Sequence, residues 1–141
     1  MSTFKINDFI DEINSINHAN AKQVLSKIYT NDVIFVDPVK SIDGLENLTE
    51  YFEDLYKSLS SCHFTLKNHT LNDHQHSIEW LMRFQHKKIG NNLPLELEGA
   101  SFIKFKDEKV CYHRDYYDLG ALVYEHIPIL GSVIKKVRHA I

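Results

Sequence analysis

The stretch "CYHRDYYD", from Cys111 to Asp118, gathers side chains that can transfer protons. In an extended strand alternate side chains point to the same face, so residues two apart lie about 7 Å from each other. One face then carries His113, Asp115 and Tyr117, with Cys111 leading into it. An imidazole, a carboxylate and a phenol in a row are groups used in general acid–base catalysis. This row is therefore the first candidate site.

The candidate acids and bases each have a structural reading beside the catalytic one. Asp115 suits a general acid or base in the wall of a pocket, and equally a structural carboxylate bonded to a nearby Tyr or His. His113, on the same face, either orients Asp115 or is a satisfied wall residue. Asp37, in "FVDP", is a second candidate base, although an aspartate before proline commonly forms a turn.

A second segment, "SIEWLMRFQ", offers side chains for an apolar ligand. Alternation places Trp80, Met82 and Phe84 on one face, where they either pack a core or line a pocket. Trp and Met adapt well to flat apolar molecules. With Tyr117, and with Tyr56 on a predicted helix, they form the candidate ligand-binding set.

The elements that must position these residues follow from hydrophobic periodicity. Helical spacing predicts helices over 6–16, 21–28 and 45–59, the last capped by Asp43, and a strand over 32–38. Period-two alternation predicts four long strands over 63–71, 77–88, 95–105 and 109–118, joined by short polar connections that indicate antiparallel hairpins. "HQH", at 74–76, is expected to be a turn, and 129–141 an amphipathic segment.

This order predicts an α+β fold, in which a curved antiparallel sheet wraps around N-terminal helices and leaves a blind pocket. Residues 1–141 are expected to form a single domain, with 120–141 as a C-terminal helical extension. The apolar residues of that extension are expected to cap the mouth of the pocket rather than to bind a membrane.

Composition limits the classes of partner. The net charge of 141 residues is −3, while 131–141 carry +3 and the rest of the chain −6, so neither nucleic acid nor a membrane is an expected partner. Two cysteines form no disulfide framework or metal-binding spacing, and neither a metal nor an organic cofactor is expected. Without an apolar run of signal or membrane length, the protein is expected to be soluble and cytoplasmic.

Two motifs carry a resemblance to a known family. "YTNDVIFVDP" with "IDGLENLTEYFEDLY", and "FIKFKDEKVCYHRDYYD", resemble the nuclear transport factor 2-like superfamily, most closely its SnoaL-like, ketosteroid-isomerase-related group. The resemblance covers nearly the whole chain and implies a cone-shaped fold. It also implies a homodimer through the outer sheet face, where Arg114 and two tyrosines suit an interface.

The resemblance also bears on the candidate residues. In limonene epoxide hydrolase an aspartate matching Asp115 belongs to an Asp–Arg–Asp set, but the other two positions match Trp80 and Met82 here. Epoxide hydrolysis by that set is therefore not expected. Asp37 lies near the place of the ketosteroid isomerase base.

We therefore predict a cofactor-independent isomerase, polyketide cyclase or dehydratase. It would act on an apolar carbonyl compound through a pocket carboxylate, Asp115 or Asp37. The alternative is a non-catalytic ligand-binding or dimeric interaction domain of the same fold, because fold alone does not decide function.

Overall fold

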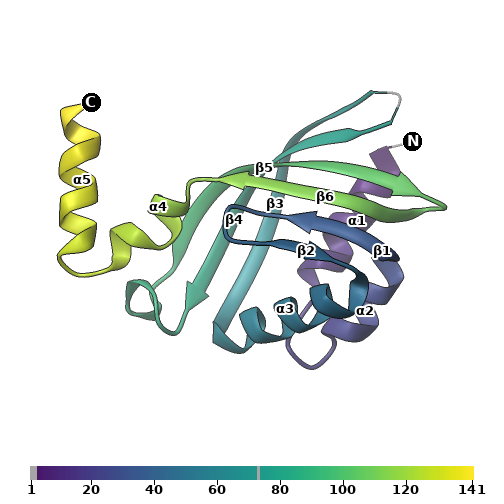
Figure 1. The fold of residues 1–141 in the computed structure, drawn as a ribbon, viewed down its shortest axis with the longest axis horizontal. Helices are drawn as coiled ribbons and strands as arrows, with labels where there is room; N and C mark the ends of the chain where they lie inside the picture. Colours follow the sequence, from purple (N-terminus) through teal and green to yellow (C-terminus); the bar gives the residue numbers. More distant parts are fainter. Residues whose placement is uncertain (1–2, 73) are drawn as a thin grey trace.

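The structure is a computed structural model that describes residues 3–72 and 74–141 (Figure 1). Its elements, in chain order, are α1 (Thr3–Asn14), α2 (Ala21–Ile28), β1 (Tyr29–Val36), β2 (Ser41–Asp43), α3 (Leu45–Ser58), β3 (Leu59–Leu71), β4 (His76–His86), the 3-10 turn η1 (Gly90–Asn92), β5 (Leu95–Lys106), β6 (Lys109–Tyr117), α4 (Leu119–Leu122), η2 (Tyr124–His126) and α5 (Leu130–Ala140). Among the described residues, every helix is too short or too polar to cross a bilayer.

The six strands form one curved sheet in the order β2-β1-β6-β5-β4-β3. The long strands β3 to β6 pair antiparallel in sequence order, as their short polar connections predict. The pair β1–β6 is parallel, because the chain passes through α3 and the three hairpin strands before it returns beside β1. The predicted α+β fold with a curved sheet is confirmed.

The core lies between the sheet and the N-terminal helices. Helix α1 buries Ile6, Phe9, Ile10 and Ile13, and the exposed fraction of each side chain is 8% or less. These positions recur every three or four residues, so a single helical stripe faces the sheet. Figure 1 shows α1, α2 and α3 gathered along one side of the sheet.

Three local expectations are wrong. The first strand begins at Tyr29 rather than 32, and Asp43 lies in the short strand β2, so that the N-cap of α3 is Gly44 without a side-chain hydrogen bond. His76 is not in a turn but begins β4 and is 1% exposed. Burial lowers the pKa of the His76 imidazole, which favours its neutral form in the core.

The C-terminal segment also differs from expectation. Helix α5 does not cap the cone, because none of its residues lines the cavity described below. It stands beyond the end of the sheet, on the side of α4 and η2 (Figure 1). Instead Leu122 and Val123, at the end of α4, take part in the cavity wall.

Gly99 on β5 makes room for the Trp80 ring on the neighbouring strand. A β-carbon at this position would lie 2.3 Å from a ring carbon of Trp80, closer than van der Waals contact allows. We expect Gly99→Ala to lower the free energy of unfolding in urea by about 1–3 kcal/mol, because the ring must shift within a packed wall. In the Trp80→Leu background the same change should cost much less. An equal cost in both backgrounds would contradict this role.

Candidate active site

A cavity of about 290 Å³ lies between the sheet and helices α1 and α3. Most of its wall is apolar or aromatic, and the polar groups are few. Every site residue predicted from the sequence lines it: Asp37, Tyr56, Trp80, Met82, Phe84, His113, Asp115 and Tyr117. The row on β4 therefore forms a wall and does not fill the cone.

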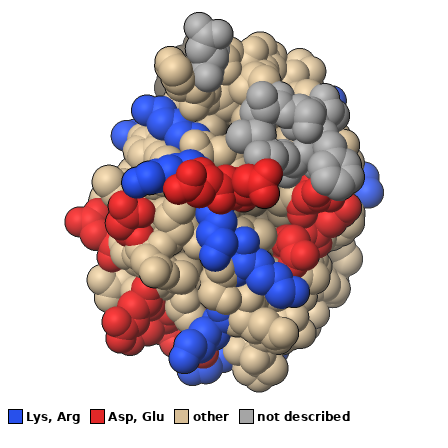
Figure 2. Space-filling model, turned by 90° about the vertical axis from the view of Figure 1, so that its right-hand side faces the viewer, with Lys and Arg blue, Asp and Glu red and all other residues tan. Residues whose placement is uncertain are grey.

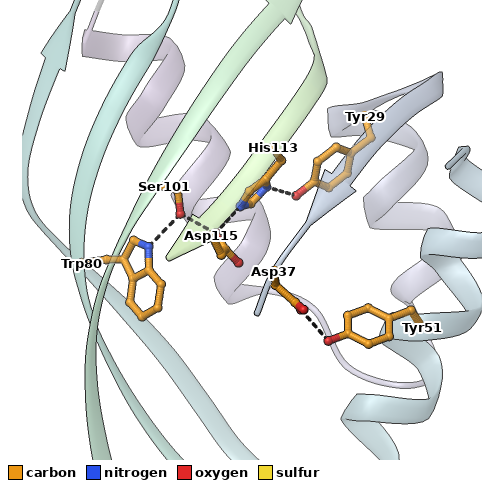
Figure 3. Close-up of polar contacts among 7 residues, drawn as sticks. All are labelled: Tyr29, Asp37, Tyr51, Trp80, Ser101, His113 and Asp115. Atoms are coloured by element: carbon orange, nitrogen blue, oxygen red, sulfur yellow. Dashed lines mark hydrogen bonds and ion pairs between the residues drawn. The ribbon is translucent and has the colours of Figure 1, made fainter. Parts of the chain in front are cut away.

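One continuous chain of hydrogen bonds joins residues of four strands, β4, β5, β6 and β1 (Figure 3). Trp80 Nε1 donates to Ser101 Oγ at 2.8 Å, and the Ser101 hydroxyl donates to Asp115 Oδ1. His113 Nε2 lies 2.6 Å from the same Asp115 oxygen. On the far side, His113 Nδ1 lies 2.7 Å from the hydroxyl of Tyr29.

Strand register brings these groups together. Ser101 on β5 is directly opposite Asp115 on β6, and Ile78 on β4 faces Ser101 from the other side. His113 and Asp115 are two apart on β6, so both point into the cone. Cys111 does not join this row.

A β-bulge explains the position of Cys111. The register shifts between Lys104, which pairs with Tyr112, and Phe105, which pairs with Val110. Cys111 is the residue left without a partner, so Val110 and His113 are both buried although they are three apart. The Cys111 thiol contacts the Lys104 carbonyl oxygen instead of leading into the cavity row.

The neighbours of His113 fix its tautomer. Among the described residues the Tyr29 hydroxyl has one hydrogen-bond partner, His113 Nδ1, and the Tyr29 side chain is fully buried. Burial, followed by the charge of Asp115, raises the pKa of Tyr29 well above its ordinary value, so the phenol keeps its proton. That proton is satisfied if Nδ1 accepts it, and Nε2 then carries the hydrogen donated to Asp115.

Asp115 is therefore held by one oxygen. Its Oδ1 accepts from Ser101 and His113, whereas no described residue hydrogen-bonds to Oδ2. The side chain is 19% exposed and lines the cavity. This leaves one carboxylate oxygen available to a molecule in the cavity.

Asp37 is engaged at both oxygens. Its Oδ1 accepts the backbone N–H groups of Val39 and Lys40, each at 2.8 Å, as in an aspartate-initiated turn. Its Oδ2 accepts the Tyr51 hydroxyl at 2.6 Å, a contact that stands apart from the Asp115 chain in Figure 3. Burial, and then this hydrogen bond, raise the pKa of Tyr51 above its ordinary value.

Tyr117 is influenced by both carboxylates. Burial raises its pKa, and the charges of Asp37 and then Asp115 raise it further. The phenol therefore stays protonated, and its hydroxyl has no hydrogen-bond partner among the described residues. A neutral phenol in the cavity wall is a hydrogen-bond donor for a ligand oxygen.

The cavity wall has a negative bias. Its charged side chains are Asp37 and Asp115, and no Lys or Arg lines it. An anion placed there would meet two carboxylates without a compensating cation. The wall therefore favours neutral or positively charged ligands. Among the described residues no group of three or more His, Cys, Asp or Glu side chains is arranged to hold a metal ion.

Sequence reasoning missed two members of the hydrogen-bond chain, Ser101 and Tyr29. Ser101 is a lone hydroxyl on the face that also carries Leu97 and Ile103, and that break in an apolar row was the available signal. Tyr29 gave no local signal, because its partner is 84 positions away along the chain.

The outer face of the sheet carries the pair expected at a dimer interface. The guanidinium of Arg114 lies 4.8 Å from the ring centre of Tyr116, which is 48% exposed. Glu98, on the outward side of β5, pairs with Lys67 in solvent. Homodimerisation through this face stays a prediction.

Comparison with known proteins places the chain in a family. A model described as "SnoaL-like domain" matches residues 7–113. The chain therefore belongs to the SnoaL-like domain family, and residues 114–141 lie outside the matched range. No curated protein matches the sequence.

Solved structures share the fold at low identity. A hypothetical protein from Catenulispora acidiphila with a ketosteroid isomerase-like fold, in complex with trimethylamine, has a TM-score of 0.74 at 16% identity, over 89% of this chain and 93% of that one. A putative SnoaL-like polyketide cyclase from a Jannaschia species has a TM-score of 0.69 at 12% identity, over 84% and 85%. A limonene-epoxide-hydrolase-like enzyme of M. tuberculosis has a TM-score of 0.66 at 8% identity, over 83% and 82%. At these identities the likeness shows the fold alone.

Cys62 provides a reporter of the cavity. It lines the wall, and burial raises the pKa of its thiol to about 11, partly offset by a hydrogen bond from Tyr56. In the Cys111→Ser variant we expect alkylation at pH 8 to be slow and to rise about tenfold per pH unit towards pH 11, because only the thiolate reacts. Circular dichroism at each pH should show that the fold persists.

The matched control is Cys62→Ser, which leaves Cys111 as the reactive thiol. An apolar molecule bound in the cavity should slow the alkylation of Cys62 and leave that of Cys111 unchanged. A Cys62 rate that levels off near pH 8.5, as for a free thiol, would argue against its burial.

Proposed function

We propose that this protein is a cofactor-independent enzyme that moves a proton on a small, apolar, neutral carbonyl compound. The observation that carries the proposal is the state of Asp115, whose Oδ1 is held by two donors while Oδ2 faces a largely apolar cavity without a partner. A carboxylate fixed at one oxygen and free at the other is well placed to act as a general base.

In the proposed reaction, Asp115 Oδ2 removes a proton from the carbon next to the ligand carbonyl. The C–H bond breaks, an O–H bond forms on Asp115, and the electron pair moves to the carbonyl oxygen as an enolate. The free hydroxyl of Tyr117 donates a hydrogen bond to that oxygen. Asp115 then returns the proton to the same carbon, which gives exchange, or to another carbon of the enolate system, which gives an isomerisation.

His113 and Ser101 serve as positioning residues in this scheme. Both donate to Asp115 Oδ1 from within the wall, and the bond to Tyr29 holds the imidazole in turn. Fixing the base in advance lowers the entropic cost of reaching the reactive geometry.

Asp37 is less suited to the role of base. Three donors already occupy its two oxygens, so removal of a substrate proton would require breaking the turn or the bond to Tyr51. We assign it to shaping the cavity and to its negative bias, which excludes anionic compounds.

A non-catalytic ligand-binding protein is the second candidate. Its support is the occupation of two wall positions by Trp80 and Met82, where the related epoxide hydrolase pattern has polar residues. An apolar wall of this kind binds a molecule without the need for chemistry.

The test is exchange of ligand protons in heavy water. The protein is incubated with a panel of apolar ketones, and loss of the signal of the protons next to the carbonyl is followed by NMR. We expect the wild type to accelerate exchange for at least one ketone and Asp115→Asn to lower that rate by at least about 100-fold, because the base is lost.

Glu98→Gln is the matched control, since it removes a carboxylate from the outer side of β5 and should leave the rate unchanged. Melting temperatures show whether each variant is folded. An exchange rate that Asp115→Asn leaves intact contradicts the proposed base. Protection of Cys62 by a ketone that shows no exchange identifies the non-catalytic alternative.

A further inference from the structure

Helix α5 leaves an apolar face uncovered. Of the thirteen large hydrophobic side chains that are exposed among the described residues, seven lie between 124 and 141. Val133 and Val137 are 52% and 55% exposed, and Leu130 is 42% exposed. Because an α-helix turns by about 100° per residue, these three form one stripe along α5.

The opposite sides of α5 carry positive charge. Residues 130–141 contain Lys135, Lys136 and Arg138 and no acidic residue. Lys136 flanks the apolar stripe, and Lys135 lies further round the helix with His139. A short helix with an apolar stripe and a basic polar side has the composition of helices that lie in the interface of a membrane.

One basic residue ties α5 to the start of α4 and to η2. Arg138 pairs with Asp118, which also accepts the backbone N–H of Ala121, and reaches Glu125 at 3.5 Å. The hydrogen bond from Arg138 lowers the pKa of the Asp118 carboxyl, so that the pair stays charged. At Gly131 a β-carbon would lie 2.3 Å from the Glu125 carbonyl oxygen, so the helix approaches η2 closely on this side.

The packed side and the apolar stripe of α5 are different faces. Gly131 and Arg138 face η2 and α4, whereas Leu130, Val133 and Val137 face away from them and remain exposed. The stripe is held outward by the contacts on the other face.

The opposite end of the molecule has an ordinary solvated surface. Figure 2 shows Lys and Arg side chains interleaved with Asp and Glu over the visible part of that end. A surface with both signs of charge has no preference for an anionic plane. Exposed large apolar side chains, by contrast, gather between residues 124 and 141.

We propose that α5 docks this protein on the surface of an anionic membrane. The apolar stripe enters the boundary between headgroups and acyl chains, and Lys136, which flanks the stripe, contacts the anionic headgroups with its flexible stem. Lys135, further round the helix, adds to the positive charge near the membrane. Helix α5 is joined to Leu122 and Val123 of the cavity wall through η2 and residues 127–129, so the bound surface lies on the side of the molecule where those two residues close the wall. The proposal departs from the sequence-based expectation of no membrane partner, which stays untested.

A second copy of the chain fits the stripe less well. A two-fold symmetric contact through α5 would bring the helix of one copy against the same helix of the other. Lys136 of each copy would then border the contact without an acidic residue between 130 and 141 to pair with it, and like charges at an interface are costly. An anionic lipid surface offers the complementary charge instead.

The test is flotation of the whole chain with lipid vesicles. We expect the wild type to float with phosphatidylcholine vesicles that contain about 30% phosphatidylglycerol, and not with pure phosphatidylcholine. Salt at about 1 M should weaken flotation, because it screens the headgroup charge. Lys135→Glu/Lys136→Glu should weaken binding by at least about tenfold, and Val133→Asp/Val137→Asp should also lose it.

The matched control is Lys22→Glu/Lys27→Glu on the exposed side of α2, which makes the same change in net charge and should float like the wild type. Circular dichroism and melting temperature confirm that all variants are folded. No flotation of the wild type, or equal loss in the α2 variant, overturns the proposal. So does a dimer in sedimentation that Val133→Asp/Val137→Asp dissociates without any change in flotation.

Discussion

The structure depends on how a carboxylate is kept inside an apolar cone. A buried carboxylate without hydrogen-bond donors would destabilise the fold by several kcal/mol, a large part of the stability of a small domain (about 5–15 kcal/mol). Here Ser101 and His113 satisfy one oxygen of Asp115, and Trp80 and Tyr29 satisfy those two residues in turn. This chain of hydrogen bonds ends at Tyr29 in the core on one side and at Trp80 in the cavity wall on the other. Every member is partnered, while one oxygen of Asp115 still faces the cavity.

Much of this could be predicted from the sequence, because periodicity reports which face of an element is buried. The alternation in "CYHRDYYD" placed His113, Asp115 and Tyr117 on the cavity side, and the fold class followed from helices before hairpins. The partners of Asp115 could not be found in this way. Ser101 and Tyr29 reach it through strand register and the parallel return of β6 beside β1, and a local pattern contains neither. The bulge at Cys111 likewise depends on pairing between strands.

The cavity wall and the C-terminal segment are adjacent in the chain and in space. The cavity wall combines two carboxylates with a lining of mostly apolar and aromatic side chains. The end of α4 completes that wall, and α5 then turns an apolar and basic surface outward, held by Arg138 on Asp118 and Glu125. Sequence reasoning expected the same apolar residues to cover the cavity mouth. The expectation was wrong because a periodic stripe shows which face of a helix is apolar. It does not show which surface, if any, covers that face.

The central claim is that His113 accepts a hydrogen bond from the Tyr29 hydroxyl at Nδ1 and donates one from Nε2 to Asp115. Two-bond nitrogen–proton NMR of the protein labelled with ¹⁵N histidine measures this directly, with the signals assigned by comparison with His113→Asn. We predict the Nε2–H tautomer for His113 at neutral pH, with Nδ1 unprotonated. A signal from the Nδ1–H tautomer would contradict the account, because Asp115 would then lose the donor that holds it. Protons on both nitrogens would also contradict it, since the carboxylate charge would already be neutralised by an imidazolium.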